Sequence, residues 1–123
     1  MPTAGELLAR EARSLVERLR LWTPERWAAA RPPYGSRGDL VHHLAQAFVD
    51  RAGETDRPLP RLDTDLALPD QLAVTADDLV RSGRAELADV AHLLAHRRDL
   101  LGEDVPAGLR DQLGDVPVEC PAS

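Results

Sequence analysis

The spacing of apolar residues predicts helices along most of the chain. In residues 4–22 the apolar positions lie four, three, four and three residues apart, as on one buried helix face. Similar stripes occur in residues 36–52, 68–81 and 85–101. No segment shows the two-residue period of a strand, so we expect an all-α protein. The four stripes are Leu8, Ala12, Leu15, Leu19 and Trp22; Leu40, Leu44, Ala47 and Phe48; Leu72, Ala76 and Leu79; and Leu87, Val90, Ala91, Leu94 and Leu101.

Local signals between these stripes predict where helices begin. Thr23 followed by Pro24 is typical of a helix start and predicts a short helix over residues 24–30. Ser36 with Asp39 three residues later resembles a capping box at the start of the second long helix. We therefore predict a four-helix bundle with a short extra helix between the first two long helices.

Two further segments complete the predicted organisation. Residues 104–106 indicate the start of a short C-terminal helix that ends near residue 113, so the bundle domain spans residues 1–113 and a flexible tail spans residues 114–123. Residues 53–67 are long enough to cross the bundle and could deliver the next helix parallel to the one before it. The short turn at residues 82–84 predicts that the last two long helices are antiparallel neighbours.

Composition narrows the class of protein. The 123 residues suffice for one domain, and the net charge of -6 argues against a nucleic-acid partner. No apolar run approaches the ~20 residues that span a bilayer, so no membrane partner is expected. The N-terminus lacks a signal pattern, and the lone Cys120 has no partner for an internal disulfide. We expect a cytoplasmic protein.

The four histidines are the main candidates for chemistry. At 100° per residue, His43 lies on the buried face of its helix and His42 points to nearly the opposite, solvated side. His92 and His96 are four residues apart, so they share one face and could hold one metal ion. The spacing leaves two alternatives open. An inward histidine is often only a hydrogen-bonded core residue, and the His92 face lies away from the main apolar stripe, as a solvated face would.

Two sequence stretches resemble a known family. Ser36-Arg37-Gly38-Asp39-Leu40-Val41-His42-His43-Leu44 is similar to the Thr-x-x-Asp-x-x-x-His-Leu stretch of the DinB/YfiT-like helical bundles. His92-Leu93-Leu94-Ala95-His96-Arg97 resembles the His-x-x-x-His-Arg segment on the last helix of that family, and Trp22-Thr23 is similar to the approach to its second helix. The resemblance covers roughly residues 4–101.

The resemblance implies a site and an activity. The family's metal site corresponds to His43, His92 and His96, which would hold a divalent ion such as Zn, Ni, Mn or Fe. Asp89 and Asp99 would accept hydrogen bonds from the imidazoles and orient them. The implied activity is S-transfer or isomerisation with a low-molecular-weight thiol, which in GC-rich actinobacteria would be mycothiol. The partner would then be a small-molecule substrate.

A second interpretation is a protein that keeps the fold without catalysis. The short chain, the offset histidine pair and the surface rich in Arg, Asp and Glu favour a module for homodimerisation or partner binding. A third interpretation is a small-ligand binder with a pocket between the helices. The positions of the histidine rings distinguish these interpretations from the metal-dependent enzyme.

Overall fold

The protein folds as an all-α bundle, as the apolar spacing predicts. The structure is a computed structural model and describes residues 2–53 and 58–102. Within those residues it contains no strand, only an isolated bridge between Ala30 and Ser36. The helices are α1 (Ala4–Leu19), α2 (Pro24–Ala28), α3 (Arg37–Arg51), the 3-10 turn η1 (Asp65–Ala67), α4 (Leu68–Arg81) and α5 (Leu87–Leu101).

Side-chain caps fix several helix starts where the sequence predicts them. The Thr23 hydroxyl accepts from the Arg26 amide, with Pro24 in the first turn of α2. The Ser36 hydroxyl accepts from the Asp39 amide at 3.1 Å, and the Asp39 carboxylate accepts from the Ser36 amide at 3.1 Å. This reciprocal capping box confirms the predicted start of α3.

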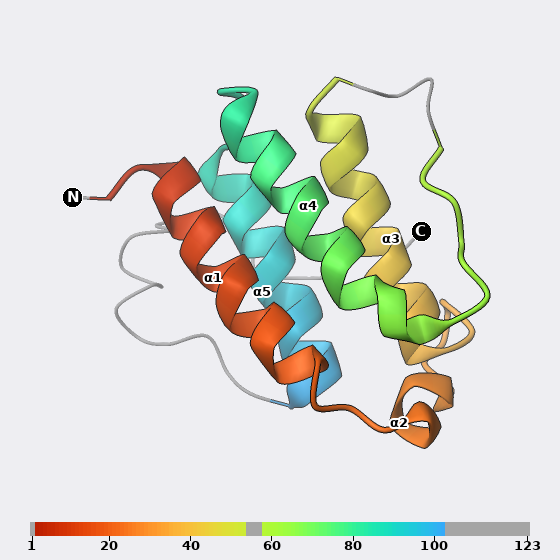
Figure 1. The fold of residues 1–123 in the computed structure, drawn as a ribbon. Coiled ribbons are helices and arrows are strands. Elements are labelled where there is room, and N and C mark those ends of the chain that lie inside the picture. The colour runs from red at the N-terminus through yellow and green to blue at the C-terminus, as the bar shows by residue number, and fades with distance from the viewer. Residues whose placement is uncertain (1, 54–57, 103–123) are drawn as a thin grey trace.

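The long helices form two parallel pairs of opposite direction (Figure 1). In Figure 1, α1 and α5 run down the view, whereas α3 and α4 run up it. The connection between α3 and α4 therefore spans the length of the bundle, as its length permits. The Leu59 amide donates to Gln46 Oε1 at 2.6 Å, which ties this connection to α3.

The four long helices surround one leucine-rich core. α4 packs against α1 and α3, and α5 packs against the same two helices from the other side. α4 and α5 are antiparallel, as predicted. They do not pack closely against each other, however, because the short turn joins two helices that lie on opposite sides of the core.

Other differences from the sequence predictions concern the ends of two helices and how much of the surface of α5 is buried. α1 ends at Leu19, three residues before Trp22, and α5 begins at Leu87. The consecutive residues Leu93 to His96 are all buried, so α5 buries more than the one apolar stripe that its sequence shows. The predicted C-terminal helix and the tail lie outside the described residues.

Candidate functional site

Three of the four histidines lie together between α3 and α5. The ring centroids of His92 and His96 are 4.4 Å apart, and those of His43 and His96 are 6.0 Å apart. His92 and His96 come from successive turns of α5, and His43 reaches them from α3, which packs against α5. We call His43, His92 and His96 the histidine cluster.

The cluster is inside the bundle rather than on a solvated face. His96 is fully buried, and His92 and His43 are half-buried. The solvated alternative for the face of His92 and His96 is therefore wrong. Because α5 packs against both α1 and α3, residues away from its main apolar stripe also become buried.

A backbone contact sets the tautomer of His96. Its Nδ1 lies 2.9 Å from the carbonyl oxygen of His92. A carbonyl oxygen can only accept, so Nδ1 carries the proton in the neutral ring and Nε2 carries the lone pair. Metal-ligating histidines are commonly fixed in this way, with one ring nitrogen donating to a carbonyl.

Burial disfavours the charged forms of His92 and His96. Burial lowers the pKa of His96 to about 4, with the neighbouring His92 and His43 acting in the same direction. Burial also lowers the pKa of His92, helped by His43 and opposed by the negative charge of Asp89. Neutral imidazoles are the form that binds transition metals.

A ring nitrogen of the histidine cluster is buried without a hydrogen-bond partner in the described part of the chain. Nε2 of His92 is buried and has no hydrogen-bond partner among the described residues. Buried polar atoms in native proteins nearly always have a partner, so this nitrogen is a candidate ligand atom. In the present side-chain positions, however, no three His, Cys, Asp or Glu residues of the described ranges are arranged to hold a metal. Ligation would therefore need the rings to turn towards one point.

The two aspartates with predicted orienting roles contact arginines. Asp89 is buried, and its Oδ1 accepts from Nε of Arg51 at 2.9 Å. Its Oδ2 accepts from the Glu86 amide at 2.8 Å, at the start of α5. Asp99 pairs with Arg31 at 3.1 Å. Their predicted hydrogen bonds to imidazoles stay a prediction.

His42 is not solvated, contrary to the helical-face prediction. It is half-buried, and its Nε2 donates to the carbonyl oxygen of Leu59 at 2.9 Å. Leu59, which precedes α4 in the chain, lies against this outer face of α3 through its bonds to His42 and Gln46. The prediction from 100° per residue fails here because it treats α3 as an isolated helix and omits the connection between α3 and α4.

Tyr34 is the functional candidate that sequence reasoning missed. Its ring centroid lies 4.9 Å from that of His43 and 6.2 Å from that of His96. Tyr34 comes from the turn between α2 and α3, where no periodic pattern indicates the direction of a side chain. Its being the only tyrosine of the chain is the one signal that the sequence offers.

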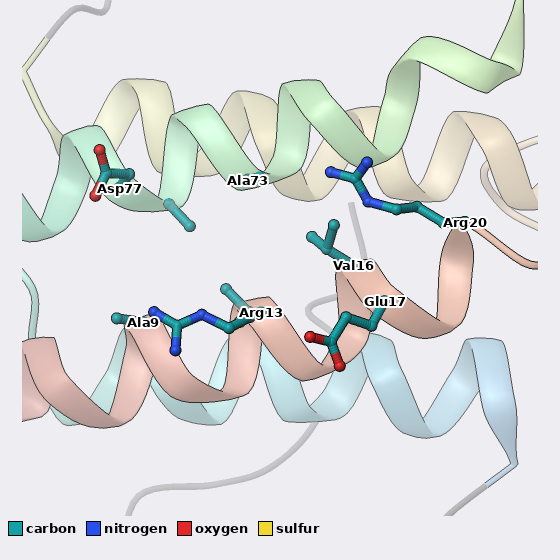
Figure 2. A pocket seen from close by; sticks show the side chains of 9 residues that line it. Ala9, Arg13, Val16, Glu17, Arg20, Ala73 and Asp77 are labelled. Atoms are coloured by element: carbon teal, nitrogen blue, oxygen red, sulfur yellow. The ribbon is translucent and has the colours of Figure 1, made fainter.

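A separate groove lies between α1 and α4, on the side shown in Figure 2. It has a volume of about 330 Å³ and combines small apolar residues with charged ones. Figure 2 shows Arg13 on α1, Arg20 directly after the last residue of α1, and Asp77 on α4. The lining residues are Ala9, Ala12, Arg13, Val16, Glu17, Arg20, Ala73, Ala76 and Asp77.

Fold and site together define an all-helical bundle with a buried histidine cluster. No family model matches the chain, and neither a curated protein nor a solved structure is detectably similar to it. Within the described residues, no helix combines the length and apolar character needed to cross a membrane.

Proposed function

We propose that the protein binds a divalent transition-metal ion at His43, His92 and His96 and uses it in thiol chemistry. The observation that carries this proposal is the grouping of three imidazoles from two helices inside the bundle. Two helices that approach each other at their histidines provide a common framework for a metal site in a helical bundle.

The ionisation of the cluster supports the same function. Burial lowers the pKa of His92 and His96, so at neutral pH no proton competes with a metal for their lone pairs. The carbonyl of His92 holds the His96 ring with Nε2 as the acceptor atom. Three neutral ligands leave the full positive charge of the ion available to an anionic ligand.

The resemblance to DinB/YfiT-like bundles suggests the reaction class. We propose an S-transferase or isomerase that uses a low-molecular-weight thiol of the mycothiol type. A bound divalent ion would supply Lewis acidity and so favour the deprotonated, nucleophilic form of the thiol. The residues of the bundle would bind and orient this thiol and keep bulk water away from it.

A metal-free binding module is the second candidate function. It is favoured by the finding that no three potential ligands of the described ranges are already arranged around one point. It is also favoured by the groove between α1 and α4, which offers an alternative place for a ligand or partner. In this function the histidine cluster would only stabilise the bundle.

Calorimetric titration of untagged protein with Zn²⁺ distinguishes the two candidates. We expect wild type to bind one equivalent. His92→Asn and His43→Asn should weaken binding by more than the roughly 10–100-fold that loss of an orienting partner causes. His42→Asn is the matched control, because His42 lies next to the cluster in sequence and bonds to Leu59 instead.

Circular dichroism of each variant establishes that the helices persist. Absence of zinc binding by the wild type would contradict the metal-dependent function and favour the binding module. Equal losses of zinc affinity in His42→Asn and His92→Asn would show that zinc binds somewhere other than the histidine cluster.

A further inference from the structure

Two arginines lie against the ring of Trp22, where α2 packs beside the start of α3 (Figure 1). Cζ of Arg26 lies 4.7 Å from the centroid of the Trp22 ring, and Cζ of Arg37 lies 5.7 Å from it. Both distances are within the range of a cation–π contact. One indole ring therefore gathers two positive charges at this end of the bundle.

The guanidinium group of Arg37 has lost part of its hydration without gaining a counter-charge. Its Nε is buried and has no hydrogen-bond partner among the described residues. No carboxylate of residues 2–53 and 58–102 forms an ion pair with Arg37 or Arg26. Burying part of a cation is unfavourable unless an opposite charge or a hydrogen-bond acceptor compensates for the lost water. Arg37 as a whole is only half-buried, so a ligand can approach its terminal nitrogens.

The carboxylates near the start of α3 bind another arginine. Arg61 lies 3.1 Å from Asp39 Oδ1 and 2.7 Å from Asp65 Oδ1. Both acids belong to the surroundings of Arg37: Asp39 is two residues later on α3, and a Cβ on Gly38 would lie 2.7 Å from Asp65 Oδ1. These acids therefore neutralise Arg61 and not Arg37.

The backbone at Arg37 is held in place before any ligand binds. Its amide donates to the Ala29 carbonyl at 2.9 Å, and it directly follows Ser36, the N-cap residue of α3. Trp22 is buried and packs edge-on against Trp27, with ring centroids 4.8 Å apart. A guanidinium that already rests on a fixed ring loses less conformational freedom when it binds a ligand.

We propose that Arg37 and Arg26 bind the phosphate or carboxylate group of a small anionic molecule beside Trp22. A planar guanidinium pairs with either oxyanion through parallel N–H donors. The net charge of -6 favours a small anion over a nucleic acid, which would be repelled by the rest of the surface. The proposal involves none of the histidines, so it is independent of the metal site.

Nuclear magnetic resonance of the arginine side chains tests the site directly. The full chain is titrated with sodium phosphate, and separately with sodium acetate, at pH 7 and at an ionic strength held constant with sodium chloride. The Nε–Hε cross-peaks of Arg37 and Arg26 report binding. The variants are Arg37→Gln and Arg26→Gln. Arg13→Gln is the matched control, because Arg13 is an exposed arginine on α1.

We expect both cross-peaks of wild type to shift and saturate with at least one of the two anions, and the anion that saturates them identifies the ligand class. The dissociation constant, read from the Arg26 cross-peak, should rise about tenfold or more in Arg37→Gln. Arg26→Gln, read from the Arg37 cross-peak, should weaken binding about threefold or more and tests the site even if Arg37→Gln does not fold.

Arg13→Gln should stay within about twofold of wild type. Shifts that grow linearly without saturation for both anions would overturn the proposal, because they would report only general screening by salt. Equal weakening in Arg37→Gln and Arg13→Gln would also overturn it, because the anion would then respond to overall charge.

Discussion

Burial of His96 has a thermodynamic consequence that does not depend on any ligand. The imidazole is fully buried, and its pKa falls to about 4 because burial disfavours the charged ring. In the unfolded chain the pKa returns to its ordinary value near 6.5. Between these two values the unfolded chain binds more protons than the folded protein, so stability rises with pH.

Metal-free protein should therefore lose stability on acidification. We expect the free energy of unfolding to fall by about 2 kcal/mol between pH 7 and pH 5 from His96 alone. The contribution of the His96 ionisation to the free energy of unfolding is complete above pH 6.5 and is lost as the pH falls towards 4. Urea unfolding in the presence of a chelator measures this change.

His96→Gln is the variant that isolates the effect. It removes the titrating group while keeping a polar side chain, so the loss of stability between pH 7 and pH 5 should be smaller by about the same 2 kcal/mol. An unchanged pH dependence in His96→Gln would show that the ring is not held neutral by burial.

Helical geometry predicts part of the candidate site at the residue scale. The inward direction of His43 and the shared face of His92 and His96 follow from positions on one helix each. The bond of His42 to Leu59 and the position of Tyr34 do not follow, because they depend on loops. Loop paths come from tertiary contacts that the local pattern does not encode.

At the scale of the element, Asp89 stabilises the start of α5. Its carboxylate accepts from the Glu86 amide and from Arg51 of α3, and the side chain is almost fully buried. Negative charge in the first turn also interacts favourably with the helix dipole. Asp89 thereby holds the helix that carries His92 and His96 against α3.

Asp89→Ala should lower the free energy of unfolding by about 1–3 kcal/mol, because it removes the amide acceptor and leaves Arg51 without this partner. Asp77→Ala is the matched control. Asp77 pairs with Arg81 on the exposed face of α4, and its loss should cost at most about 0.5 kcal/mol. Chemical denaturation of both variants checks the difference.

The zinc affinity of Asp89→Ala tests the role predicted from the sequence, in which Asp89 orients an imidazole of the histidine cluster. If Asp89 acts mainly on α5, zinc affinity should stay within about threefold of wild type. Stability equal to that of Asp77→Ala together with a loss of zinc affinity would instead show that Asp89 orients the imidazole of His92.

The sequence predicts where the helices begin more reliably than it predicts which of their faces are buried. Helix starts at Thr23 and Ser36 follow from caps, which are local chemistry. The extent to which α5 is buried does not follow from its sequence, because it is set by contacts with α1 and α3 on different sides. For the same reason the face of His92 and His96 resembles a solvated face in the sequence.

At the scale of the whole molecule, chain topology creates the site. The connection between α3 and α4 spans the bundle, so α3 and α4 run in the same direction and α5 returns opposite to them (Figure 1). α5 can then pack against α3 as well as α1, which brings His43 to the histidine pair. Residues 53–67 are numerous enough to join the end of α3 to the start of α4 at the opposite end of the bundle.

The measurement that tests the metal site most directly is X-ray diffraction from zinc-soaked crystals near the zinc absorption edge. We predict one anomalous peak within about 2.0–2.1 Å of a ring nitrogen of each of His43, His92 and His96. The imidazole rings should have turned towards that peak from their present positions. Absence of a peak between α3 and α5, or a peak bound only by surface carboxylates, would contradict the proposed metal site.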